Sequence, residues 1–364
     1  MKLKKISSIF IFIIIFMIIS ILMIYSSTIY LDEVFKYIYL KQLLYYLLGF
    51  IIIFIIMYLK NKYILNFTVY FYIFINILLL ITLVFAPVIN GSRCWLMIGP
   101  FSFQPSELMK IAIILMLANI ITKHKENGDQ SDLILIKKTF LVVLIPSILV
   151  FLEPDTGNVI IYFLILLSSL LISGLNKKII ITSCISIFTI FIIFISLYLF
   201  NKNLLINIFS SDIIYRIERI ISWQNKSGMQ LENSLVAIGS SYLFGHGYMH
   251  NPIYLIESST DFIFSVLASN FGFIGSGLFL ILILLFDLKL LSVALNNKKL
   301  TNKIIVIGSF VAILFPQIQN IAMTMGLLPI TGIPLPFISY GGTNILTLMI
   351  LMGLIINIEK ASAY

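Results

Sequence analysis

Residues 1–27 read MKLKKISSIFIFIIIFMIISILMIYSS, and the apolar run inside this stretch decides the fold class. A helix of about 20 apolar residues crosses the roughly 30 Å hydrocarbon core of a bilayer. The basic start is typical of a signal peptide, but the run is about twice as long as a signal peptide's apolar region, and no small-residue cleavage site follows. The stretch therefore predicts an uncleaved first membrane span.

The composition of the whole chain extends this prediction. Sixty per cent of the 364 residues are hydrophobic and only 11% are charged, whereas about a quarter of the residues of soluble domains are charged. The net charge of +9 comes from lysines in short clusters between apolar runs, as in proteins whose lysines fix orientation across a bilayer. We therefore expect an integral membrane protein and no nucleic-acid partner. Cys94 and Cys184 offer no disulfide framework or metal-ligand spacing.

Apolar runs long enough to span a bilayer as helices recur along the whole chain. The sequence predicts an all-α integral membrane protein with ten transmembrane helices in one bundle, which makes residues 1–364 a single polytopic membrane domain. The predicted spans are 6–28, 43–59, 64–86, 106–122, 138–153, 157–173, 179–200, 261–286, 304–325 and 337–358.

Lysine and arginine counting sets the expected orientation. With a cytoplasmic amino terminus, about 16 of the 24 basic residues fall on the cytoplasmic side. Both termini are then cytoplasmic, and the polar stretches lie outside, including a large extracytoplasmic loop, about 201–260, between the seventh and eighth spans. A long loop among tight connections is usually functional.

Two pairs of residues lie near the outer end of the fourth span. Glu107 and Lys110 are three residues apart and share a helix face. They either form a structural ion pair or line an outward cavity in which Lys110 meets an anionic ligand. Trp95 is typical of an interfacial aromatic belt, while Arg93 beside it suits a phosphate group.

Asp261 begins the eighth predicted span and follows three hydroxyl residues, 258–260. A carboxylate there is favoured by the helix dipole, so a capping role is one interpretation. The other is a general base, because partial burial at the rim of a cavity makes a carboxylate a better proton acceptor. Glu257 would lie one helical turn away, where it could tune Asp261 or share a cation with it.

Arg216 and Arg219 share a face of a predicted amphipathic helix on the membrane surface. Interface anchoring and phosphate binding are equally good interpretations of this pair. His246 and His250 have a metal-compatible spacing, but the glycines on either side of His246 argue against the helix that the spacing needs.

Residues 329–342, PITGIPLPFISYGG, contain too many prolines and glycines for a continuous helix. Non-helical backbone at membrane depth is tolerated where protein buries it or where it lines a water-filled cavity, so we expect an outward-open cleft beside the tenth span. Ser339 in this stretch is a candidate substrate-binding residue. In the ninth span, Gln317, Gln319 and Asn320 are expected to form hydrogen bonds across helices.

Several of these stretches resemble signatures of the SEDS family of shape, elongation, division and sporulation proteins, which includes RodA, FtsW and SpoVE. The similar stretches are GSRCWLMIGPFSFQPSELMKIA at 91–112, EPDTG at 153–157, SLVAIGSSYLFGHG at 234–247, TDFIF at 260–264 with GFIG at 272–275, and TGIPLPFISYGG at 331–342. They follow the family's order.

The resemblance implies a SEDS-like bundle that polymerises lipid II into peptidoglycan glycan strands at the outer face of the cytoplasmic membrane. The implied partner is a class B penicillin-binding protein. The family's essential aspartate matches Asp261, which would deprotonate the GlcNAc 4-hydroxyl of an acceptor while undecaprenyl pyrophosphate leaves with inversion. The leaving group would be stabilised by Arg93, Lys110, the helix with Arg216 and Arg219, or a divalent cation such as Mg²⁺ or Mn²⁺.

The chain departs from the family pattern near Asp261. It has Ile256 where the family has proline, Ser259 where the family has histidine, and Ser269-Asn270 in place of an acidic pair. Two alternatives to an enzyme are a lipid II flippase and a non-catalytic scaffold for the penicillin-binding protein. A flippase needs cationic residues along the whole crossing, whereas here the unusual polar groups gather outside.

Overall fold

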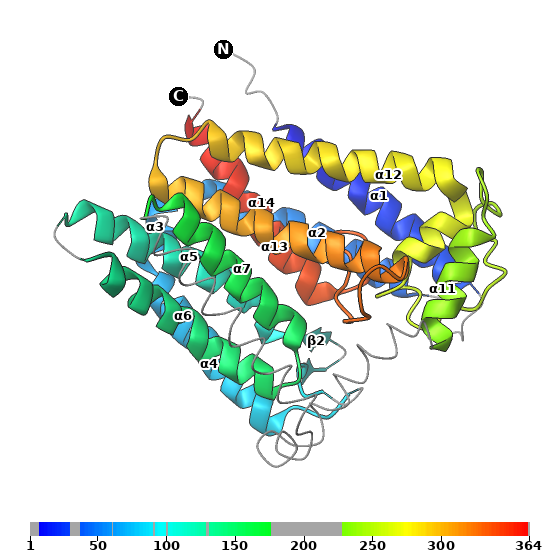
Figure 1. Cartoon of the computed structure of the whole chain (residues 1–364), viewed down its shortest axis with the longest axis horizontal. Helices are drawn as coiled ribbons and strands as arrows, with labels where there is room; N and C mark the ends of the chain where they lie inside the picture. The colour runs from blue at the N-terminus through cyan, green and yellow to red at the C-terminus, as the bar shows by residue number, and fades with distance from the viewer. Residues whose placement is uncertain are drawn as a thin grey trace.

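The computed structural model describes residues 7–29, 37–59, 61–89, 92–99, 101–128, 131–175 and 228–362. Within these ranges, eight helices are long and apolar enough to cross a membrane, and a ninth apolar helix is shorter. Figure 1 shows them as a bundle of long, tilted helices. The chain is therefore a multi-pass, mainly helical membrane protein. The predicted seventh span, 179–200, and the part of the predicted loop before residue 228 lie outside the described residues.

The long helices follow the predicted spans with shifted ends, and the short helices α3 and α11 are additional to them. The helices are α1 Ser8–Thr28, α2 Ile38–Tyr58, α3 Asn61–Asn66, α4 Thr68–Phe85, α5 Pro105–Glu126, α6 Asp132–Leu152, α7 Thr156–Ile172, α11 Met229–Gly239, α12 Ile263–Leu295, α13 Leu300–Thr324 and α14 Gly342–Ser362.

The second span shows why hydropathy misplaces such ends. Helix α2 begins at Ile38, not at 43 as predicted, and includes the polar Gln42. That side chain is buried, and its amide donates to Ser20 Oγ and to the carbonyl of Ser339, both at 3.1 Å. Tertiary hydrogen bonds therefore let the helix extend through a residue that hydropathy excludes.

A short hairpin is an exception to the all-α prediction. Strands β1 Leu96–Ile98 and β2 Phe101–Phe103 pair antiparallel between α4 and α5. Gly99 lies in the connection with φ of +60°, a conformation that glycine adopts without strain.

Three helices form the centre of the bundle. In an apolar 18-residue stretch of each helix, 72% of the residues of α5 and 67% of those of α13 and α14 are buried. In α1, α2 and α6 the buried share is 33%. The peripheral helices therefore present most of their apolar surface outward, as lipid-facing helices do. Helices α2 and α14 approach each other closely at Gly49, where a Cβ atom would lie 2.4 Å from Met349 Cγ.

Helix α12 is broken at Gly272, whose φ of 64° and ψ of −159° are not helical. The backbone of residues 242–247 fits against the break, with Phe273 N donating to Tyr242 O at 2.9 Å and His246 N donating to Ser269 O at 2.8 Å. Residues 263–270 before the break are all buried. The 23 residues after it measure about 35 Å as a helix, enough to cross a bilayer. Helix α12 therefore continues nine residues beyond the end of the predicted span 261–286.

The two described ends of the chain lie together. Ser7 Oγ donates to Glu359 Oε2 at 2.5 Å, and Lys289 Nζ forms an ion pair with Glu359 Oε1 at 2.6 Å. Figure 1 accordingly shows the start of α1 and the end of α14 at the same end of the bundle. We refer to this as the terminal end.

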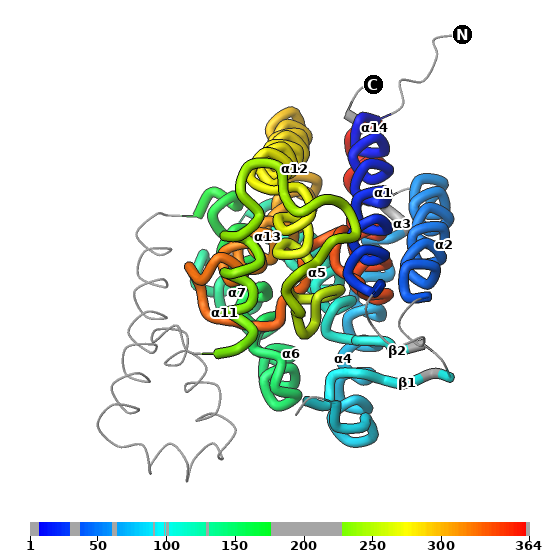
Figure 2. The backbone as a smooth tube through the Cα atoms, turned by 90° about the vertical axis from the view of Figure 1, so that its right-hand side faces the viewer, coloured from blue at the N-terminus to red at the C-terminus, as the bar shows by residue number. Residues whose placement is uncertain are grey.

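The opposite end gathers the polar connections, and we refer to it as the loop end. Figure 2 looks onto it and shows α11, the β1–β2 hairpin and the orange segment that leads into α14. That segment, residues 325–341, is non-helical, as the prolines and glycines predict. The polar stretches singled out in the sequence therefore meet at one end of the bundle.

Candidate functional site

Asp261 lies just before a helix and not in its first turn. Helix α12 begins at Ile263, and Phe262 occupies the N-cap position without a side-chain cap. Residues 257–262 form a turn instead, in which Thr260 N and Phe262 N both donate to Glu257 O, at 3.2 and 3.1 Å. Asp261 therefore immediately precedes the N-cap position of α12.

The turn is joined directly to the non-helical segment 325–341. Tyr340 N donates to Ser259 O at 2.8 Å, and Ser339 Oγ donates to Thr260 O at 2.5 Å. The Ser339 hydroxyl also accepts from Leu335 N at 2.8 Å. Ser339 is buried, so its observed role is to join two backbone segments.

Helix α13 holds the same two segments through Asn320. Its Nδ2 donates to Asp261 O at 2.9 Å and to Ile333 O at 2.8 Å. The neighbouring Gln319 donates to Pro329 O at 2.9 Å. For these two amides the predicted hydrogen bonds across helices are wrong, because the acceptors belong to non-helical backbone.

The Asp261 side chain is partly exposed and lies against an exposed glycine. A Cβ atom on Gly332 would lie 3.4 Å from Asp261 Oδ2, and Gly332 has φ of +72°. The carboxylate therefore faces backbone that leaves room beside it. The outward-open cleft itself stays a prediction.

Glu257 does not lie one helical turn from Asp261, because residues 257–262 are not helical. It is exposed, has φ of 55°, and its Oε2 accepts from Thr260 Oγ1 at 2.9 Å. The helical spacing assumed for this pair is therefore wrong.

Glu107 and Lys110 form the expected pair on the first turns of α5, with 2.8 Å between Oε2 and Nζ. Pro105 starts this helix at a position where its missing N–H costs nothing. Only 4% of Glu107 and 5% of Lys110 is exposed. Such a buried pair is costly to break, because one charge would be left without a partner. The structural ion pair is thus observed, and an anionic ligand of Lys110 would have to share it with Glu107.

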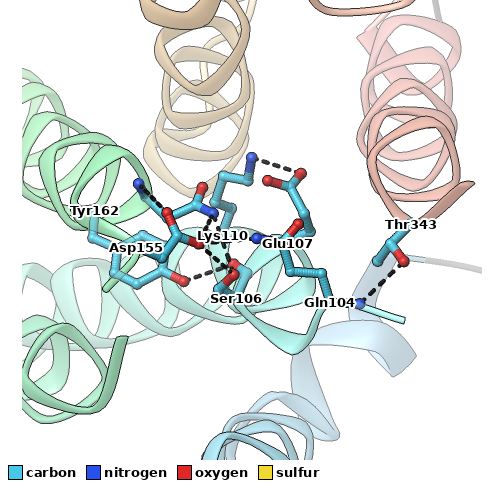
Figure 3. Close-up of polar contacts among 8 residues, drawn as sticks. Gln104, Ser106, Glu107, Lys110, Asp155, Tyr162 and Thr343 are labelled. Atoms are coloured by element: carbon cyan, nitrogen blue, oxygen red, sulfur yellow. Dashed lines mark hydrogen bonds and ion pairs between the residues drawn. The ribbon is translucent and has the colours of Figure 1, made fainter. Parts of the chain in front are cut away.

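Asp155, which the sequence analysis did not assign a role, connects α7 to the start of α5 (Figure 3). Its Oδ2 accepts from Gln104 Nε2 at 2.9 Å, Ser106 Oγ at 2.9 Å and Asn158 Nδ2 at 2.8 Å. Its Oδ1 accepts from Asn158 N at 3.2 Å and caps α7. The EPDTG motif pointed to this region, but hydropathy could not show which residue organises it.

Glu153 is the second residue that the sequence analysis missed. It is 0% exposed, and neither carboxylate oxygen has a hydrogen-bond partner among the described residues. Burial, and then the negative charge of Asp155, raise the pKa of Glu153 from 4.5 to about 8. Glu153 is therefore mostly protonated at neutral pH.

Arg93 and Trp95 lie on either side of Cys94 in the segment before β1. The Cys94 side chain is buried and its Sγ contacts Glu153 O at 2.9 Å. Arg93 is exposed and Trp95 is half-buried. The thiol thus fixes this segment beside residue 153 and leaves the guanidinium group accessible.

The polar residues around Asp261 and those around Asp155 both contact the non-helical segment 325–341 or the start of α14. Gln104 N donates to Thr343 Oγ1 at 3.2 Å, a contact that Figure 3 also shows. Gly157 packs so closely against Ile333 that a Cβ atom would lie 2.7 Å from Ile333 Cγ1. The segment that carries Ile333 therefore contacts both the Asp155 region and Asp261.

Some predicted site residues are not placed with these groups. Arg216 and Arg219 lie outside the described residues. His246 lies in a non-helical segment, as expected, and its Nε2 is 3.0 Å from Ser240 Oγ. Within the described ranges, no three His, Cys, Asp or Glu side chains are grouped to hold a metal ion. These residues alone therefore do not fit a protein-built divalent cation site.

Comparison with known proteins identifies the family of the chain. The family model described as FTSW_RODA_SPOVE, cell cycle protein, matches residues 6–364. The chain belongs to the FtsW/RodA/SpoVE family. The resemblance seen in the motifs is therefore confirmed.

Curated members of the FtsW/RodA/SpoVE family match most of the chain. Peptidoglycan glycosyltransferase RodA of Treponema pallidum is 30% identical over 94% of each chain. Probable peptidoglycan glycosyltransferase FtsW of Coxiella burnetii is 34% identical over 79% of this chain and 77% of its own length. Stage V sporulation protein E of Bacillus subtilis is 30% identical over 76% of this chain and 73% of its own length.

Solved structures show the same fold. A chain from a study of polymerisation and crosslinking by a peptidoglycan synthase complex aligns with a TM-score of 0.80, 22% identity and 99% coverage of both chains. The rod shape determining protein RodA of Thermus thermophilus aligns with a TM-score of 0.72 and 22% identity, over 100% of this chain and 99% of that one.

Proposed function

We propose that this protein is a peptidoglycan glycosyltransferase that polymerises lipid II into glycan strands, with Asp261 as the general base. One observation carries the proposal: the partly exposed Asp261 carboxylate lies on a turn that is joined to the non-helical segment 325–341 and to α13. The family supports it, because several curated relatives are named peptidoglycan glycosyltransferases.

The proposed topology has ten membrane spans, with the seventh at 179–200 and a large extracytoplasmic loop at about 201–260. Both termini are cytoplasmic, and the loop end faces outward, which places Asp261 at the outer surface of the cytoplasmic membrane. The lysine distribution supports this orientation. So does the pairing of Ser7 with Glu359, which puts both described ends of the chain on one side.

In the proposed reaction, Asp261 takes the proton from the GlcNAc 4-hydroxyl of the acceptor lipid II. The oxygen attacks the anomeric muramic carbon of the growing strand, and the bond from that carbon to the pyrophosphate oxygen breaks with inversion. The electron pair leaves with undecaprenyl pyrophosphate.

The leaving group gains negative charge and needs cationic groups near it. The exposed Arg93 is the more accessible of the two described candidates, because Lys110 is buried beside Glu107. Trp95, Arg216 and Arg219 complete the proposed substrate-binding set, together with Glu257. A requirement for Mg²⁺ or Mn²⁺ stays a prediction, since magnesium is often held by substrate phosphates with only one or two carboxylates.

The test uses the purified full-length protein with each candidate class B penicillin-binding protein and labelled lipid II. Wild-type protein is expected to form glycan polymer, and Asp261→Asn is expected to form none while keeping its melting temperature. Normal polymer from Asp261→Asn would remove the general-base assignment. A parallel arm with a chelator tests the cation.

The same assay distinguishes the alternatives. A flippase would move lipid II across a vesicle membrane without forming polymer. A scaffold would support its partner equally well with Asp261→Asn. The wild-type chain is expected to behave as neither.

A further inference from the structure

Asn320 lies near the loop end of α13, and its side chain leaves the helix to contact two separate segments. The residue is 0% exposed. Its Nδ2 donates to Asp261 O at 2.9 Å and to Ile333 O at 2.8 Å, so both amide hydrogens are used. The two acceptors are 59 and 13 residues away in the sequence.

These two bonds act on both sides of the Asp261 carboxylate. One holds the backbone of Asp261 itself. The other holds Ile333, whose neighbour Gly332 lies against Asp261 Oδ2. One amide therefore fixes the position of the carboxylate relative to the backbone beside it, and it ties both to a central helix of the bundle.

The remaining polar atom of the amide makes no comparable contact with the described residues. Asn320 Oδ1 is buried and has no hydrogen-bond partner among the described residues. A buried acceptor without a partner lowers the stability of the folded state. An apolar side chain of similar size would avoid that cost, but it would leave the carbonyls of Asp261 and Ile333 without this donor, so what the amide supplies here is the pair of donated bonds.

We propose that Asn320 is a positioning residue for Asp261, which sets the direction in which that carboxylate meets the acceptor hydroxyl. This inference rests on the proposed function of Asp261 as a general base. Asn320 acts through Asp261 and does not need to contact the substrate.

The chain offers a matched control in the adjacent residue. Gln319 is also buried, on the same helix, and its amide also donates to the non-helical segment, at Pro329 O. This hydrogen bond to Pro329 O does not involve Asp261. A purely structural role of buried amides in α13 would therefore affect Gln319 and Asn320 variants alike.

The experiment compares Asn320→Leu with Gln319→Met, which remove the two amides with little change in side-chain size. The full-length protein is assayed with its partner and labelled lipid II. Asn320→Leu is expected to lower kcat by about 100-fold, the effect of a misplaced catalytic group, with KM changed by less than about threefold. Gln319→Met is expected to keep kcat within about threefold of wild type. Asn320→Ser, which cannot reach both carbonyls, replaces Asn320→Leu if the latter does not fold.

Hydrogen exchange gives a second readout that does not depend on activity. Exchange in peptides covering 257–262 and 332–340 is expected to rise at least about tenfold in Asn320→Leu and to stay unchanged in Gln319→Met. Equal kcat or equal exchange in the two variants would overturn the inference. If wild-type protein makes no polymer, the proposed function fails, and the exchange data alone decide whether Asn320 holds the two segments.

Discussion

The Glu153→Gln variant should gain stability relative to the wild type as the pH rises, because the wild type loses stability and the variant does not. Glu153 is buried without a hydrogen-bond partner for its carboxylate among the described residues, and its pKa is raised from 4.5 to about 8. In the unfolded chain the same carboxyl group ionises at its ordinary pKa. Between these two values the folded state binds a proton that the unfolded state has lost, so stability falls as the pH increases.

The size of the effect follows from the two pKa values. Each pH unit between 4.5 and about 8 costs the wild type about 1.4 kcal/mol of unfolding free energy, or on the order of 3 kcal/mol by pH 7. Glutamine has nearly the same shape and does not ionise, so the variant escapes this loss. Its amide still lacks a partner, which sets a constant cost of about 1–3 kcal/mol at every pH.

The measurement is the unfolding free energy in detergent micelles at pH 5, 6, 7 and 8. The difference between Glu153→Gln and wild type should rise in favour of the variant by about 1.4 kcal/mol per pH unit and level off above pH 8. Glu257→Gln, at an exposed carboxylate at the same end of the bundle, serves as the control for the glutamate-to-glutamine replacement itself. A flat difference for Glu153→Gln, or one that falls with pH, would mean that Glu153 is ionised with a partner and would refute the reasoning.

Two further substitutions test the packing around the site. Lys110→Met leaves the buried Glu107 without its cation and should cost about 3–5 kcal/mol of unfolding free energy, most of which Glu107→Gln in the same chain should restore; a double variant no more stable than Lys110→Met would contradict this. Gly272→Ala places a Cβ atom 2.4 Å from Gly245 N at a φ of +64° and should cost more than about 3 kcal/mol or abolish folding. Gly277→Ala on the same helix has open space and should be tolerated, so equal yields of monodisperse protein from the two alanine variants would show that the break in α12 is not required.

The sequence alone determined the membrane class and most of the spans, because hydropathy is a local property that burial in lipid selects directly. It also predicted the non-helical stretch at 329–342, since proline and glycine act on their own backbone. The pairing of Glu107 with Lys110 was also predictable locally, because a separation of three residues along one helix brings two side chains close together.

Only the tertiary structure decided where the polar groups meet. The neighbours of Asp261 in sequence suggest a helix cap, but its turn is held by distant residues. Asn320 bonds to Asp261 from 59 residues away, and Ser339 bonds to Thr260 from 79 residues away. The break at Gly272 likewise depends on the backbone at Gly245, which no local pattern reveals. Glu153 and Asp155 follow one helix end at nearly the same place in the sequence, yet one has no hydrogen-bond partner for its carboxylate among the described residues and the other accepts four bonds. Whether a buried polar group finds partners depends on what other segments bring to it, and that is settled only when the helices pack.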